Sequence, residues 1–238
     1  MDVRIRPHTL AGAVTPPPSK SMAHRLLLAA ALADGVSTVQ NVALSQDIEA
    51  TLRCMAALGA SWEQADKSTL RVTGIGGKRK PFTELPRFDC GESGSTLRFF
   101  IPLALDGRGP VRLIGHGRLM QRPLTVYQNL FAPLGVVWRQ EGDALTVEGE
   151  LKSGRFELPG DVSSQFITGL LLALPRLEGD SEIVVTTPLE SRAYVELTRR
   201  VQREFGVTSA WRDGGQTLLV RGGQEAVSPG TLHIEGDW

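Results

Sequence analysis

The chain has 238 residues, and its 26 Lys and Arg balance its 26 Asp and Glu, so the formal net charge is zero. That balance excludes bulk attraction to nucleic acid or to an anionic membrane surface, and any anion binding has to be local. The two cysteines and four histidines have no metal-ligand spacing, so neither a disulfide framework nor a metal site is expected.

The expected compartment is the cytoplasm. The first residues, Met-Asp-Val-Arg-Ile-Arg, contain no apolar core of a signal peptide. The apolar runs at 26–33 and 170–175 are far shorter than the ~20 residues that a bilayer requires. We therefore expect no membrane contact, and no feature of the chain calls for a cofactor.

The first predicted helix follows a run of prolines. Short strands are predicted at 3–5 and at Val14, before the prolines at 16–18. Proline disfavours helix in the residue before it, so the helix begins after Pro18 and runs to the turn at 34–35. Lys20 and Arg25 lie near its start, where the helix dipole disfavours cations. Cations in that place indicate an anion that binds from outside, although they could also simply reach solvent.

The remaining elements repeat one order three times. Strand 37–42, helix 47–59 and a hairpin at 61–63 and 69–72 complete the first unit. The second unit is predicted as strand 88–90, helix 99–105, strand 111–114, helix 123–134 and strands 136–138 and 144–147. The third unit is predicted as strand 156–158, helix 166–174, strand 182–185, helix 194–205 and strands 209–211 and 217–220.

This order is βαβαββ in each unit. Gly59, Gly135 and Gly206 end the second helices at intervals of 76 and 71 residues, so the three units are in register. The first helix of each unit is apolar on all sides and should be buried, whereas the second is amphipathic. We predict an α/β domain of three repeats, at about 15–85, 86–150 and 154–223. It is an inside-out, barrel-like fold with three buried parallel helices at the centre and sheets outside.

The starts of the three buried helices gather donors and cations with few acids. They carry Lys20, Ser21 and Arg25, the segment 94–98, and Ser163, Ser164 and Gln165, while the loops at 118–123 and 191–194 add Arg122, Ser191 and Tyr194. Free N–H groups and hydroxyls at helix starts suit phosphate or carboxylate oxygens.

Each of these residues also has an ordinary structural interpretation. Gly94 could be a turn glycine, Ser163 and Ser164 could be helix caps, and Tyr194 could be a core residue. Arg98 and Arg122 could form surface salt bridges. Three further acids, Asp47, Asp89 and Asp161, are interpreted as caps or turn formers, not as catalytic acids, and nothing marks Cys90 as a nucleophile.

Five motifs at these positions resemble the 5-enolpyruvylshikimate-3-phosphate (EPSP) synthase family. They are Pro-Ser-Lys-Ser-x-x-x-Arg at 18–25, Gly-Glu-Ser-Gly-Ser-Thr-Leu-Arg at 91–98, Arg-x-x-Gln-Arg-Pro at 118–123, Val-Ser-Ser-Gln-Phe at 162–166 and Ser-Arg-Ala-Tyr at 191–194. The resemblance implies two similar three-repeat domains with the active site between them. It implies that this chain is the first half: 1–14 would begin the other domain, 15–226 would form the complete domain, and 227–238 would cross back.

The resemblance also implies roles for the candidate residues. The family transfers the enolpyruvyl group of phosphoenolpyruvate to the 5-hydroxyl of shikimate 3-phosphate, through a tetrahedral intermediate and without a metal. Lys20 would be catalytic and touch both substrates. The residues implied to hold shikimate 3-phosphate are Lys20, Ser21, Arg25, Ser163, Ser164, Gln165, Ser191 and Tyr194, and those implied to hold phosphoenolpyruvate are Lys20, Gly94, Arg122 and Gln165.

Three positions depart from the family pattern, since His24 and Glu92 replace a common Asn and Phe99 replaces a common Pro. Further family ligands belong to the other domain, so the chain alone is expected to be a monomer without turnover that needs the missing half as partner. Two alternatives remain. One is a relative of the enolpyruvyl transferase that acts on UDP-N-acetylglucosamine, and the other is a non-catalytic anion-binding domain.

Overall fold

The computed structural model describes residues 4, 9, 11–78 and 81–237. The described chain forms three four-stranded mixed sheets, each with one parallel pair and two antiparallel pairs. Their strand orders are β12-β1-β3-β2, β4-β5-β7-β6 and β8-β9-β11-β10. The strands are β1 (Val36–Gln40), β2 (Ser61–Asp66), β3 (Thr69–Thr73), β4 (Arg87–Asp89), β5 (Val111–Ile114), β6 (Val137–Glu141), β7 (Ala144–Glu148), β8 (Arg155–Leu158), β9 (Ser181–Val185), β10 (Ser209–Arg212), β11 (Thr217–Val220) and β12 (Thr231–His233).

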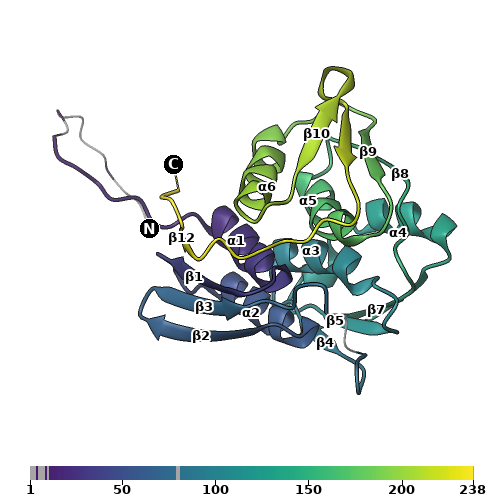
Figure 1. The fold of residues 1–238 in the computed structure, drawn as a ribbon, viewed down its shortest axis with the longest axis horizontal. Coiled ribbons are helices and arrows are strands. Elements are labelled where there is room, and N and C mark those ends of the chain that lie inside the picture. Colours follow the sequence, from purple (N-terminus) through teal and green to yellow (C-terminus); the bar gives the residue numbers. More distant parts are fainter. Residues whose placement is uncertain (1–3, 5–8, 10, 79–80, 238) are drawn as a thin grey trace.

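Three helices form the centre, as the apolar runs predict. They are α1 (Lys20–Leu32), α3 (Gly94–Ala104) and α5 (Ser164–Ala173), and almost every residue of each is buried. The amphipathic helices α2 (Gln46–Leu58), α4 (Thr125–Phe131) and α6 (Arg192–Glu204) bury one face. In Figure 1 the sheets lie around the central helices, which no single repeat could bury alone.

Helices α3 and α5 pack closely because of Gly169. A Cβ at this position would lie 2.6 Å from the carbonyl oxygen of Arg98 and would overlap the hydroxyl of Tyr127. That hydroxyl donates to the carbonyl oxygens of Arg98 and Phe166, at 3.0 and 2.9 Å. The contact holds the beginnings of α3 and α5 together, and these carry two of the five motifs.

The first sheet differs from the expected repeat. Val14 lies in no strand, and the strand expected at 3–5 falls outside the described residues apart from Arg4, which is not in a strand. The place that β4 and β8 take in their sheets is filled by β12, which pairs in parallel with β1. Residues 231–233, expected in a segment that leaves the domain, thus complete its first sheet.

Helix boundaries also differ from the expected ones. Helices α3 and α5 begin at Gly94 and Ser164, not at Phe99 and Phe166, because Ser93 and Ser163 cap them. The helix expected at 123–134 is shorter. It ends as α4 at Phe131 and continues as a 3-10 turn through Leu134, where Pro133 interrupts the α-helical pattern. The earlier starts place Gly94 and Ser164 in first helical turns.

Candidate anion-binding site

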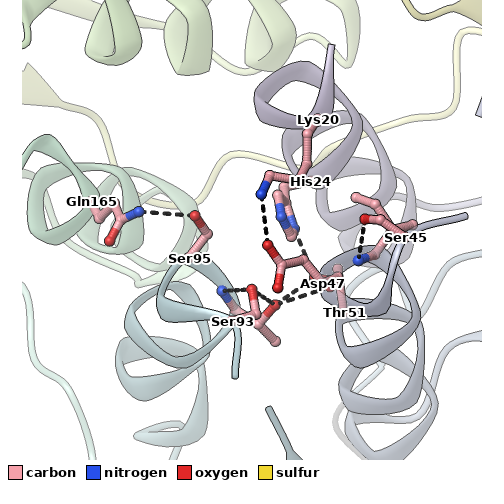
Figure 2. A network of polar contacts seen from close by, with 10 residues as sticks. Lys20, His24, Ser45, Asp47, Thr51, Ser93, Ser95 and Gln165 are labelled. Atoms are coloured by element: carbon pink, nitrogen blue, oxygen red, sulfur yellow. Dashed lines mark hydrogen bonds and ion pairs between the residues drawn. The ribbon is translucent and has the colours of Figure 1, made fainter. Parts of the chain in front are cut away.

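The first turns of α3 and α5 are in contact, and Arg25 connects the N-terminal part of α1 to α5. The side-chain amide of Gln165 at the start of α5 donates to Ser95 Oγ on α3 at 2.9 Å (Figure 2). Gln165 Oε1 accepts from Nη1 of Arg98 at 2.6 Å. Arg25 on α1 reaches Thr168 Oγ1 on α5 at 3.3 Å. The positive ends of three helix dipoles therefore share one region of the molecule.

Serine hydroxyls cap all three helices. The hydroxyls of Ser19, Ser93 and Ser163 accept from backbone N–H groups of the first turns, at 3.4, 3.2 and 3.3 Å. For Ser163 the capping interpretation is thus correct in the free chain. Ser164, the next residue, is buried in the first turn of α5.

Arg25 is a buried cation with neutral partners. Arg25 belongs to α1, and the residue is only 3% exposed. The guanidinium donates to Thr198 Oγ1 and to the Ser21 carbonyl oxygen, both at 2.8 Å, and it lies over the rings of Phe99 and Tyr194. Burial lowers its pKa to about 10, against an opposing effect of Tyr194, so Arg25 stays protonated at neutral pH.

Arg122 and Arg98 approach each other over Gly94. A Cβ at Gly94 would lie 2.6 Å from Nη1 of Arg122 and 3.3 Å from Nη1 of Arg98. The loop residue and the helix glycine, 28 positions apart in the printed sequence, are therefore neighbours. Burial lowers the pKa of Arg98, and the Arg122 charge adds to that shift against an opposing effect of Tyr127. Two like charges side by side destabilise each other unless an anion lies between them.

Among the described residues, the contacts of Arg98 are with neutral groups. It donates to Gln165 Oε1 and to the Pro123 carbonyl oxygen, and it lies over the Phe166 ring. Its Nε is buried without a hydrogen-bond partner among the described residues. Within the same residues, none of Arg25, Arg98 and Arg122 forms an ion pair with a carboxylate.

Lys20 differs from these arginines because it has an acidic partner. Its Nζ lies 2.7 Å from Oδ2 of Asp47 in the first turn of α2, and its side chain is 55% exposed (Figure 2). The interpretation of Asp47 as a helix cap is wrong, because Ser45 caps α2. Asp47 is an acid in the first turn of α2, and its carboxylate binds the amine of Lys20.

The remaining candidates line the same region more loosely. Tyr194 is 47% exposed, so the core interpretation is wrong, and its ring covers Arg25. Ser191 is the cap residue of α6, but its side chain makes no cap hydrogen bond. Ser21 is half-buried in the first turn of α1 and accepts from Arg25 through its carbonyl oxygen.

A buried polar network lies behind Lys20 (Figure 2). His24 Nδ1 is 2.8 Å from Thr51 Oγ1, which is 2.7 Å from Thr96 Oγ1, and Thr96 donates to Ser93 Oγ at 2.8 Å. His24 Nε2 is buried without a partner among the described residues. Burial lowers the pKa of His24 to about 4, with Asp47 opposing this shift and Arg25 and Lys20 reinforcing it.

Sequence reasoning missed the threonines that hold Arg25. Thr168 and Thr198 are fully buried, lie 3.0 Å apart through their hydroxyls, and both contact the guanidinium. One signal was available, because Thr198 lies four residues after Tyr194 and so shares its helix face. Thr168, within an apolar helix, gave no comparable signal.

The described residues contain neither a metal-binding cluster nor a membrane-spanning helix. No group of three or more His, Cys, Asp or Glu in the described ranges is arranged to hold a metal ion. No helix in those ranges is both long and apolar enough to cross a membrane.

Fold and site together define an α/β protein in which three arginines, without a carboxylate partner among the described residues, lie at or beside the N-termini of the central helices. Such an arrangement suits the oxygens of small phosphorylated or carboxylated molecules. The family model of EPSP synthase (3-phosphoshikimate 1-carboxyvinyltransferase) matches residues 5–238. The chain belongs to the EPSP synthase family.

Curated relatives are similar over the whole chain. The 3-phosphoshikimate 1-carboxyvinyltransferase of Clostridium novyi is 41% identical and that of Clostridium beijerinckii 42% identical, each over 100% of this chain. The matches cover 56% and 55% of those relatives, so the chain spans about half of their length. A solved EPSP synthase from Acinetobacter baumannii superposes with a TM-score of 0.79 at 23% identity, over 94% of this chain and 49% of that one, which shows the shared fold.

Proposed function

We propose that this chain is the shikimate-3-phosphate-binding half of an EPSP synthase. The complete enzyme would transfer the enolpyruvyl group of phosphoenolpyruvate to the 5-hydroxyl of shikimate 3-phosphate and release phosphate. The observation that carries the proposal is that three arginines, Arg25, Arg98 and Arg122, lie at or beside the starts of the central helices without a carboxylate partner among the described residues. Both substrates carry a phosphate and a carboxylate, which suit such cations.

The proposed substrate subsites lie on different helices. Shikimate 3-phosphate would bind along α1, α5 and α6, where Arg25 is held between Thr168 and Thr198 and covered by Tyr194. The residues proposed there are Lys20, Ser21, Arg25, Ser163, Ser164, Gln165, Ser191 and Tyr194. Phosphoenolpyruvate would bind beside α3, at Lys20, Gly94, Arg122 and Gln165. Gln165 contacts both Ser95 and Arg98, a position that supports its place in both sets.

Fixing two anions side by side is the main contribution that this half could make to the reaction. Bringing the 5-hydroxyl and the enolpyruvyl carbon into reacting position requires that the repulsion between the substrates be offset, and preorganised cations do this. Lys20 would contact both substrates and would hold the departing phosphate. In the free chain the amine of Lys20 is paired with Asp47, so substrate binding would replace this carboxylate with a substrate anion.

The chain by itself is proposed to bind and not to turn over. Its candidate site is an open surface, since the side chains of Lys20 and Tyr194 are about half exposed. Residues 15–226 are proposed as the three-repeat domain, with β12 completing its first sheet, and the flanking segments as its connections to the other half. The catalytic groups of that half would close the site.

The test is an activity assay with and without the missing half. The chain and a separately produced C-terminal half of a clostridial relative are mixed with phosphoenolpyruvate and shikimate 3-phosphate, and phosphate release is measured. Release is expected from the mixture and from neither part alone. Release with UDP-N-acetylglucosamine in place of shikimate 3-phosphate would assign the chain to the sister enzyme instead. Turnover by the chain alone would refute its role as a half enzyme.

A further inference from the structure

One carboxylate outside the proposed subsites joins three segments of the chain. Asp89 ends β4, and its Oδ1 accepts from the Gly91 N–H at 3.0 Å and lies 2.9 Å from Nε2 of His116. Its Oδ2 lies 3.1 Å from Nε of Arg53 on α2. Partial burial would raise the pKa of Asp89, but the Gly91 N–H, Arg53 and His116 together hold it below its usual value.

Two of these segments carry the residues proposed for phosphoenolpyruvate. Gly91 belongs to the turn that leads into α3 and Gly94, and His116 begins the loop that ends in Arg122. The His116 N–H donates to the Gly91 carbonyl oxygen at 2.6 Å, so the turn and the loop are joined through backbone as well as through Asp89. From His116 the loop continues through a short 3-10 helix, Leu119–Gln121, directly to Arg122.

Glu92 adds a second contact between the same segments. A Cβ at Gly117, which has a φ of +57°, would lie 2.8 Å from the carboxyl carbon of Glu92. The side chain of Glu92 therefore covers the loop at Gly117, where the positive φ favours glycine and a larger residue would displace the carboxyl group. Glu92 replaces the Asn that is common in the family, so this contact is a feature of the present chain.

The contacts of Asp89 with His116 and Arg53, called the clamp from here on, act against a force that separates two cations. The guanidinium groups of Arg122 and Arg98 converge over Gly94, and repulsion between them favours a loop that moves away. We propose that Asp89, together with His116 and Arg53, is a positioning group that holds the Arg122 loop against the start of α3 and so preassembles a binding site for a phosphoryl anion. The ligand part of this inference rests on the proposed function, whereas the loop geometry does not.

The first experiment observes the free chain by NMR. The nuclear Overhauser effect between the Arg122 side chain and the Gly94 α-protons reports the contact over Gly94. It should be present in the wild type and lost or strongly weakened in Asp89→Asn, which keeps the size of the side chain but removes its charge. The matched control is Asp161→Asn, since Asp161 occupies the equivalent turn before α5 and accepts from Thr187 Oγ1 at 2.8 Å. An unchanged Overhauser effect in Asp89→Asn would overturn the proposal.

The second experiment measures affinity for inorganic phosphate by calorimetry. Asp89→Asn should raise the dissociation constant about three- to fivefold, the range for a partly exposed ion pair, and Asp161→Asn should not. In an Arg122→Ala background the same Asp89→Asn change should have no further effect, because Asp89 acts through Arg122. Equal effects in both backgrounds would mean a merely structural role. Absence of phosphate binding by the wild type would refute the anion site, and the Overhauser effect would still decide on the clamp.

Discussion

The replacement of His24 by Asn should remove a pH-dependent part of the stability. In the folded chain His24 is 1% exposed, hydrogen-bonded to Thr51, and its pKa lies at about 4. In the unfolded chain an ordinary His has a pKa of about 6.5. The folded state resists protonation, so the stability from neutral His24 is complete above pH 6.5 and is lost as pH falls from 6.5 towards 4.

The size of the effect follows from the two pKa values. The full difference corresponds to about 3 kcal/mol, and the part lost between pH 7 and pH 5 is about 2 kcal/mol. His24→Asn has no titrating ring, so its free energy of unfolding should fall less over this interval. Carboxylates with lowered pKa, such as Asp89 and Glu196, affect both proteins alike and cancel in the comparison.

The assay is urea unfolding of both proteins at pH 7, 6 and 5. The difference in free energy of unfolding between wild type and variant should shift by about 2 kcal/mol in favour of the variant as pH falls. Any constant cost of the substitution does not matter, because only the change with pH is compared. His116→Asn is the control, since His116 is exposed and pairs at the surface. Parallel curves for wild type and His24→Asn would refute the reasoning.

Three further substitutions test other parts of the account. Arg25→Met should weaken binding of shikimate 3-phosphate at least about tenfold in calorimetry. Urea unfolding should show no loss of stability, because a buried charge without an acidic partner among the described residues destabilises the fold. A lower free energy of unfolding for the variant would contradict this reasoning. Asp47→Asn releases Lys20 from an exposed ion pair, so the free energy of unfolding should change by less than about 1 kcal/mol. Shikimate 3-phosphate should bind more tightly, because it no longer competes with Asp47 for Lys20. Weaker binding by the variant would contradict this competition. Gly169→Ala should lower the free energy of unfolding by about 1–3 kcal/mol, because its methyl group overlaps Tyr127, and an unchanged urea midpoint would show that α3 and α5 can separate without cost.

The architecture could be predicted largely because it is repeated. Each unit shows an all-apolar helix, an amphipathic helix that ends at a glycine and a closing hairpin, so errors in one unit are corrected by the others. Gly59 and Gly135, for example, both have the positive φ that such helix ends require. The first unit was mispredicted where the repeat fails, since its outer strand comes from residues 231–233, and a pairing between residues so distant leaves no local pattern.

The candidate site was predictable in its location but not in its pairing. The motifs place cations and hydroxyls at helix starts, and the structure brings those starts together through Gln165, Ser95 and Arg98. Packing between different helices decides which of these cations forms an ion pair with a carboxylate. Lys20 contacts Asp47, whereas the partners of Arg25 among the described residues are neutral groups and rings, and neither outcome follows from local sequence.

Binding of shikimate 3-phosphate at the converging helix starts can be observed residue by residue in a titration followed by NMR. Adding shikimate 3-phosphate to the chain should shift the backbone amides of Ser163 and Ser164 and the Nε–H of Arg25, with smaller changes at the Arg122 loop. The same titration with the missing half present should show tighter binding. Saturable binding without shifts at Ser163, Ser164 and Arg25, or no binding at all, would contradict the account.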